Sequence, residues 1–242
     1  MLEYSSSPLP FTGMELFEGL TIRELLKNGK LPQGRAAAIA TSICQVAYYL
    51  QRHGVPHVDI EPADILVGPD DRVKLVHYGM TSKVGARRLT YTKLSQLFGT
   101  SAYVSPEELE GRQTGAGSDV YSIGIILYEM LTGTLPFPGR DPTERVTTYP
   151  IPPREAEPTI SPQLQEVIYR ALEREPRNRY ASVRELEHDL IHLAEVGVAD
   201  RPELHQWRKR RHKLRAKAIA RYAALVLIPV IIFSLILYFA RR

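Results

Sequence analysis

Residues 223–240 form the segment that most constrains how this chain can fold, because all eighteen of them are uncharged. A helix of that length would measure about 27 Å, close to the roughly 30 Å thickness of the hydrocarbon core of a bilayer. Pro229 lies inside the segment, and membrane helices tolerate proline better than exposed soluble helices do. The segment therefore predicts one transmembrane helix at residues 222–240. The alternative interpretation is a helix buried in a protein core.

The charge distribution favours the membrane interpretation. Residues 201–242 hold eleven lysines and arginines and one acidic residue, so this tail carries a net charge of +10 while the whole chain carries +4. Eight of these cations stand just before the uncharged segment, a pattern that holds the preceding residues in the cytoplasm. Each could gain about 1 kcal/mol from an anionic lipid surface. A nucleic-acid patch is disfavoured, because Trp207 is the cluster's only nearby aromatic residue outside the apolar segment.

Five motifs follow one another along the rest of the chain, and their order and spacing resemble those of the large lobe of a protein kinase. In that family they form the catalytic loop, the strand leading to Asp-Phe-Gly, the end of the activation segment, a long buried helix and a segment supplying a late arginine. The arrangement is similar to bacterial membrane-anchored Ser/Thr kinases and covers roughly residues 2 to 195. The motifs are His57-Val58-Asp59-Ile60-Glu61-Pro62-Ala63-Asp64, Val73-Lys74-Leu75-Val76-His77-Tyr78-Gly79, Gly99-Thr100-Ser101-Ala102-Tyr103-Val104-Ser105-Pro106-Glu107, Ser118-Asp119-Val120-Tyr121-Ser122-Ile123-Gly124 and Glu175-Pro176-Arg177-Asn178-Arg179-Tyr180.

The resemblance also shows where the catalytic residues have changed. It implies that His57 opens the catalytic loop and that Asp59 keeps the position of the catalytic base. Glu61 stands where the family has a lysine that binds the transferring phosphate, so the charge there is reversed. His77 replaces the aspartate that is the main Mg²⁺ ligand, and imidazole is a poor ligand for this hard cation. Asp64 replaces a metal-binding asparagine and retains the oxygen ligands that Mg²⁺ prefers.

ATP and Mg²⁺ are thus the cofactors that the resemblance implies, with binding that we expect to be weak or absent. For the adenine, the resemblance indicates Glu15 and Phe17 at the hinge between the lobes and Leu66 beneath the ring. Three further residues have structural positions in the family. Asp119 supports the catalytic loop from below, and Glu107 and Arg179 form a buried pair.

The small lobe of a kinase is expected to be largely missing. No Gly-x-Gly-x-x-Gly motif and no lysine precede the hinge, and the first lysine of the chain is Lys27. Residues 1–19 can therefore hold only remnant strands and the hinge. Two explanations stay open: the gene product is short, or this chain is a truncated form of a longer protein.

The expected fold class is α+β, a protein-kinase-like fold with a mostly helical large lobe, remnant small-lobe strands and one C-terminal transmembrane helix. Periodicity and caps predict helices at 20–27, 34–53, 119–131, 161–172 and 182–195, strands at 65–67 and 73–76, and a loop at 139–159. The single Cys44 excludes an intramolecular disulfide. The predicted organisation is 1–19 for the small-lobe remnant and hinge, 20–197 for the large lobe, 198–221 for a basic juxtamembrane segment, 222–240 for the span and 241–242 for a short tail.

These changes predict a catalytically impaired pseudokinase, more a binding module than an enzyme. It would be a single-pass membrane protein with a cytoplasmic kinase-like domain that docks on or regulates a protein partner, such as a full kinase, and binds no nucleic acid. The alternative is a Ser/Thr protein kinase that transfers phosphate from ATP to protein, either truncated here or using unconventional chemistry. A third interpretation is a decaying gene without function.

Overall fold

The computed structural model describes residues 15–54, 60–76, 102–112, 114–137, 139, 141–202, 204, 207 and 227, and the backbone alone at 3–5 and 11–13. The chain divides into two compact units, Met1–Ala199 and Asp200–Arg242. Apart from Leu227, the predicted span at 222–240 lies outside the residues that the structure describes. Within the described residues, no helix combines the length and the apolar character needed to cross a membrane.

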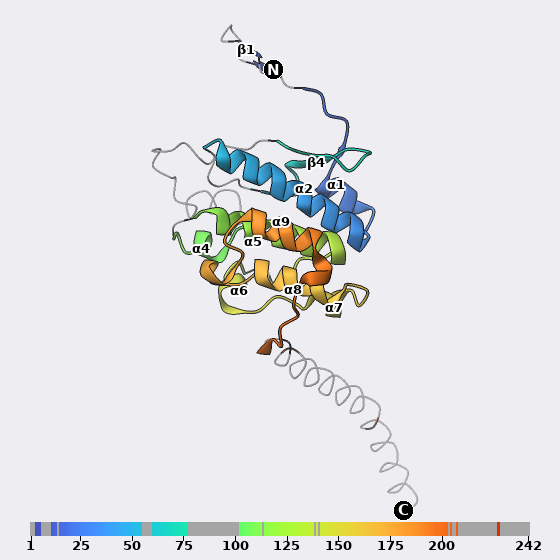
Figure 1. Ribbon diagram of the computed structural model, residues 1–242, viewed down its shortest axis with the longest axis vertical. Coiled ribbons are helices and arrows are strands. Elements are labelled where there is room, and N and C mark those ends of the chain that lie inside the picture. The colour runs from blue at the N-terminus through green and yellow to red at the C-terminus, as the bar shows by residue number, and fades with distance from the viewer. Residues whose placement is uncertain are drawn as a thin grey trace, which may run out of the picture. The chain divides into compact units, whose positions relative to one another are not determined.

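The core of the first unit is built mainly from four helices, which pack against one another and can be followed in Figure 1. They are α2 (Gln33–Arg52), α5 (Ala116–Thr132), α8 (Pro162–Ala171) and α9 (Val183–Ile191). Helix α5 contacts each of the other three, and α9 also packs along α2 and α8. The apolar side chains of these contacts form one continuous buried cluster that includes Cys44, which is fully buried. The helical large lobe expected from the sequence is therefore present.

Helix α5 is central because its sequence is apolar around nearly its whole circumference, so it has no face to offer to water. Most of its residues are buried. Gly124 allows a close approach to α8, since a Cβ at this position would lie 2.9 Å from Cβ of Ala171. Gly133 ends the helix in the left-handed region with φ of 71°, a conformation that glycine adopts without steric cost.

The strands form two small antiparallel sheets. Strands β1 (Glu3–Ser5) and β2 (Phe11–Gly13) pair as a hairpin. Strand β4 (Ile65–Val67) lies between β3 (Leu20–Thr21) and β5 (Val73–Leu75) in the second sheet. In β4 the outer two residues are buried and the middle one is half-exposed, as the period of two in a strand requires.

Three sequence predictions needed correction. The helix expected at 20–27 is α1 (Ile22–Lys27), because Leu20 and Thr21 pair with β4 and the Thr21 side chain caps α1. The helix expected at 182–195 ends at Ile191 and is followed by the short 3₁₀ helix η2 (Leu193–Glu195). The loop expected at 139–159 contains two helical turns, α6 (Glu144–Thr147) and α7 (Pro153–Ala156). Single turns of four residues are too short to show a helical period, and tertiary contacts decide whether they form.

Two further short elements come from motifs of the sequence. Helix α4 (Pro106–Leu109) follows Ser105, whose hydroxyl and backbone N–H both donate to the Glu108 carboxylate. The 3₁₀ helix η1 (Pro176–Asn178) brings the chain to Arg179. These two elements place Glu107 and Arg179, the partners of a buried ion pair, beside the first turn of α5.

Candidate functional site

The catalytic-loop motif is described from Ile60 onward. His57 and Asp59, the predicted loop histidine and base, lie outside the described residues, and so does His77. Glu61 and Asp64 are half-buried in the short connection that leads from α2 to β4. The described part of the site therefore consists of the residues after the base position and the elements that pack against them.

Glu61 is held beside α1. Its carboxylate Oε2 lies 3.8 Å from Nη2 of Arg23, and the side chains are 28% and 58% exposed respectively. The backbone N–H of Arg23 also donates to the carbonyl of Pro62 at 3.2 Å, which ties the first turn of α1 to the loop. The Glu61 carboxylate, which reverses the charge found in the family, therefore has a cation next to it. An ion pair this exposed contributes little to stability.

A tyrosine and a second carboxylate extend this polar group. The hydroxyl of Tyr103 donates to Oε2 of Glu129 on α5 at 2.7 Å. The pKa of Tyr103 is raised mainly by burial, and the hydrogen bond to Glu129 raises this pKa further. The charge of Arg23 lowers the pKa of this hydroxyl and that of Glu61 raises it. Arg23, Tyr103 and Glu129 were not predicted from the sequence, because nothing in local spacing brings α1, α5 and the segment before α4 together.

Asp64 is positioned by its backbone. Its N–H donates to the carbonyl of Glu61 at 3.0 Å, and its carbonyl accepts from the N–H of Val76 at 2.8 Å, just after β5. A carboxylate here suits Mg²⁺ chemically. Within the described residues, however, no three histidine, cysteine, aspartate or glutamate side chains lie close enough together to hold a metal ion.

The three residues predicted to contact adenine are brought together around Lys74. Leu66 is opposite Lys74 in the register of β4 and β5. The Lys74 ammonium lies 5.7 Å from the centre of the Phe17 ring and 3.3 Å from the Glu15 carboxylate. Lys74 was not predicted as a site residue, although its place on the strand after Leu66 was the available signal. The structure thus brings Glu15, Phe17 and Leu66 to one place, and it puts a cation among them.

Asp119 lies at the start of α5 and is fully buried. Its Oδ2 accepts a hydrogen bond from Nε2 of Gln51 at 2.7 Å. Gln51 belongs to the last turn of α2, so Asp119 connects the central helix to the end of the helix that precedes the catalytic-loop motif. Its predicted support of residues 57–59 concerns residues outside the described part of the chain.

Glu107 and Arg179 form a buried bidentate pair. The two hydrogen bonds measure 2.8 Å and 2.7 Å, and both side chains are almost completely inaccessible. The remaining guanidinium donors go to the carbonyls of Glu173, Gly117 and Arg174, so all five are used. Burial alone would raise the pKa of Glu107, but the hydrogen bonds and charge of Arg179 outweigh it and lower that pKa.

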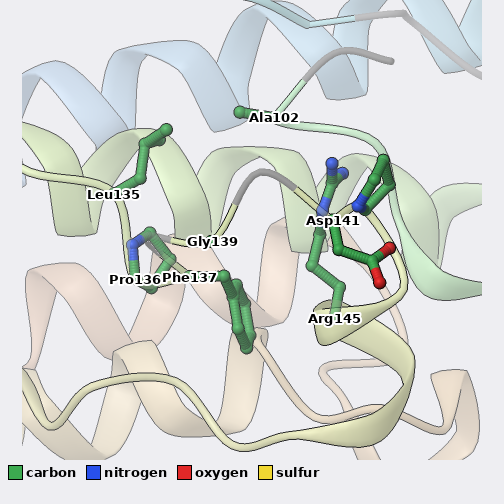
Figure 2. A pocket seen from close by; sticks show the side chains of 8 residues that line it. Ala102, Leu135, Pro136, Phe137, Gly139, Asp141 and Arg145 are labelled. Atoms are coloured by element: carbon green, nitrogen blue, oxygen red, sulfur yellow. The ribbon is translucent and has the colours of Figure 1, made fainter.

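A small pocket of about 100 Å³ lies near the end of the activation-segment motif (Figure 2). The Arg145 side chain is buried there, and its Nη1 donates to the carbonyl of Val104 at 2.7 Å. This bond ties α6 to the segment before α4 and explains why a helical turn forms within the predicted loop. The lining residues are Ala102, Leu135, Pro136, Phe137, Gly139, Asp141, Pro142 and Arg145.

Comparisons with known proteins support the resemblance to protein kinases. A model of the protein kinase domain matches residues 10–191. The serine/threonine-protein kinase PknB of Mycolicibacterium smegmatis is 34% identical over 207 residues, which cover 84% of this chain and 33% of PknB. A probable serine/threonine-protein kinase of Streptomyces coelicolor is 35% identical over 187 residues, covering 75% of this chain and 28% of that protein. The chain spans about a third of the length of these relatives. With its helical lobe, its buried Glu107–Arg179 pair and this match over most of its length, the chain belongs to the protein kinase family.

Proposed function

We propose that this chain is a catalytically impaired member of the protein kinase family that acts as a docking or regulatory module. The observation that carries the proposal is Glu61, a half-buried carboxylate at the position where the family has a phosphate-binding lysine. Phosphoryl transfer is catalysed mainly by positioning and by electrostatic stabilisation of the charged transition state. An anion at this position opposes the charge that has to be stabilised.

The size of the electrostatic energy supports this proposal. Two unit charges 4 Å apart interact by about 4 kcal/mol at the effective dielectric constant of a protein surface. Replacing an attraction by a repulsion of even a quarter of that size would change the rate by more than tenfold. Arg23 lies beside Glu61 but is more exposed than it, so its charge is screened by water and offsets the carboxylate in part. The described residues therefore do not fit a triphosphate well.

The pocket near Arg145 supports a docking role. Its apolar wall includes Leu135 and Phe137, while Arg145 and Asp141 supply polar groups at its edge. This combination suits one side chain of a protein partner better than a free small molecule, whose pockets are usually at least about three times larger. A full kinase is the partner that we propose.

The expected result with the purified full chain is no incorporation of radiolabelled phosphate from ATP, either into itself or into an added protein substrate. Wild type and Asp59→Asn should give the same background counts with Mg²⁺ or Mn²⁺. An active bacterial kinase of the same family, assayed in parallel, shows that the assay detects transfer. Incorporation by the wild type that Asp59→Asn abolishes would overturn the proposal.

That opposite outcome would favour the second candidate, a Ser/Thr protein kinase transferring phosphate from ATP to protein. Two observations support it. The relatives are named as serine/threonine-protein kinases. The chain also retains a carboxylate at Asp64, where Mg²⁺ would need an oxygen ligand.

We further propose that residues 222–240 anchor the module in a membrane, with the kinase-like lobe in the cytoplasm. Eighteen uncharged residues preceded by eight cations support this placement. The full chain is expected to remain in the membrane fraction after an alkaline carbonate wash. Arginine costs about 2.5–3.5 kcal/mol at the centre of a membrane helix, so the double variant Ile231→Arg, Ile232→Arg should move the protein to the supernatant. Ile191→Arg adds a cation at an exposed position of α9 and should leave the distribution unchanged. Wild type in the supernatant would refute the anchor.

A further inference from the structure

Two histidines lie one helical turn apart at the end of α9, on a part of the lobe that the proposed function does not use. His188 is in the last turn of the helix, and His192 is the residue that caps it. Their rings are stacked with centres 4.4 Å apart and planes 29° from parallel. Both side chains are exposed, so neither ring is packed into the core.

The hydrogen bonds define which nitrogen of each ring is available. Nδ1 of His192 lies 2.9 Å from the carbonyl of His188, and a carbonyl can only accept. Nδ1 of His188 lies 3.4 Å from the Asp189 carboxylate, which as an anion also only accepts. In the neutral form, each ring therefore carries its proton on Nδ1 and a lone pair on Nε2. The two lone pairs belong to neighbouring rings at the same helix end.

Asp189 is itself held in place. Its Oδ2 accepts a hydrogen bond at 2.9 Å from the hydroxyl of Tyr180, a buried core residue. Arg170 lies 3.6 Å from the same oxygen. A carboxylate that binds the Nδ1–H of a histidine orients the ring and makes Nε2 a better metal ligand. His188 thus has the supporting partner that metal-binding histidines generally have.

We propose that His188 and His192 together chelate one divalent transition-metal ion through their Nε2 atoms. Imidazole nitrogen suits copper, nickel and zinc, and side chains at positions i and i+4 of a helix face one another. The rings need only tilt toward each other at their Nε2 edges, and exposed side chains do this without disturbing the core. A cation is also favoured electrostatically beside the last carbonyls of a helix.

The site is an open one. Within the described residues no third histidine, cysteine, aspartate or glutamate joins the pair as a candidate ligand. Water therefore completes the coordination, and those positions are exchangeable. Because the ion would join the last turn of α9 to its cap, binding should stabilise this helix end.

The test is calorimetric titration of the full chain, carrying no polyhistidine tag, with Cu²⁺, Zn²⁺ and Mg²⁺ salts in a non-chelating buffer. We expect one site that binds Cu²⁺ more tightly than Zn²⁺ and no binding of Mg²⁺ at this site. His188→Gln and His192→Gln should each weaken Cu²⁺ binding by at least tenfold. Both positions are exposed, so the variants should fold as the wild type does by circular dichroism.

His53→Gln is the matched control. His53 caps α2 as His192 caps α9, and its Nδ1 likewise donates to the carbonyl one turn earlier, that of Tyr49, at 2.7 Å. Its neighbour across the turn is the Tyr49 ring, 4.1 Å away, where His192 has a second histidine. His53→Gln should leave the affinity unchanged, whereas Tyr49→His should create a second site and raise the stoichiometry from one to two.

Two results would overturn the proposal. One is Cu²⁺ affinity in His188→Gln and His192→Gln that stays within twofold of wild type. The other is a loss in His53→Gln as large as in those variants. Either would place any bound ion elsewhere on the chain, and neither depends on whether the chain transfers phosphate.

Discussion

Replacing Arg179 by glutamine is expected to destabilise the kinase-like lobe by about 3–5 kcal/mol, because removing one partner of a buried ion pair leaves the other charge buried and uncompensated. In this protein the uncompensated charge would be Glu107, which is almost fully inaccessible. The substitution also leaves three backbone carbonyls without the guanidinium donors that satisfy them. A loss of this size is a large share of the 5–15 kcal/mol that stabilises a typical domain.

Urea denaturation of the full chain, followed by far-ultraviolet circular dichroism, measures this loss. Arg35→Gln is the matched control, because Arg35 also bonds a carboxylate, that of Asp71, at 2.8 Å, but with both side chains more than a third exposed. It should cost no more than about 1 kcal/mol. If the two variants lose the same free energy of unfolding, burial of the Glu107–Arg179 pair does not increase the cost of breaking it.

The same pair implies a direction of pH dependence. Arg179 lowers the pKa of Glu107 in the folded protein. Glu107 therefore contributes stability that is present above its unfolded-state pKa, about 4.3, and is lost as the pH falls through the lower folded-state pKa. In the Arg179→Gln variant this acid-dependent component should shrink, because the cation that lowers the pKa is gone.

Replacing Glu61 by lysine is expected to tighten the binding of ATP by roughly tenfold or more. The change removes a carboxylate and restores the cation that the family places against the transferring phosphate. A tenfold gain corresponds to about 1.4 kcal/mol, well below the several kcal/mol that two such charges exchange at close range. Glu61→Gln, which removes the repulsion without adding a cation, should give a smaller gain.

The measurement is a titration of the full chain with ATP, with and without Mg²⁺, followed by thermal unfolding. Glu195→Lys changes the net charge by the same amount at an exposed position of η2 and controls for general attraction of the polyanion. It should raise affinity by less than twofold. If Glu61→Lys binds ATP no better than wild type, the charge at this position does not limit binding and the proposed reason for lost catalysis fails.

Local patterns predicted the larger helices well. The segment of α5 is apolar around its circumference, and a helix of that kind has to be buried whatever surrounds it. Gly133 ends α5 with a positive φ and the Ser161 side chain caps the start of α8, and both are properties of single residues that a local pattern can contain. The resemblance to the family also predicted a long-range contact. Glu107 and Arg179 were expected to pair, and the structure shows their hydrogen bond across 72 positions of sequence.

Where local signals were weak, the predictions failed. Residues 144–147 form a helical turn within a predicted loop, because the buried Arg145 side chain bonds the carbonyl of Val104 from a distant part of the chain. Leu20 and Thr21 looked helical by their spacing but pair with β4, a strand more than forty residues later. In both cases a long-range hydrogen bond decided the outcome, and no short window of sequence contains both of its partners.

Residue types and motif spacing were enough to predict the family, the order of the large helices, the reversed charge at Glu61 and the apolar segment near the C-terminus. Each of these is a property of one stretch of chain. Three contacts became known from the folded chain: Arg23 lies beside Glu61, Lys74 lies over the Phe17 ring, and Asp189 contacts His188 next to His192. Side-chain rotamers and the packing of distant elements set these contacts, and neither is encoded in local periodicity.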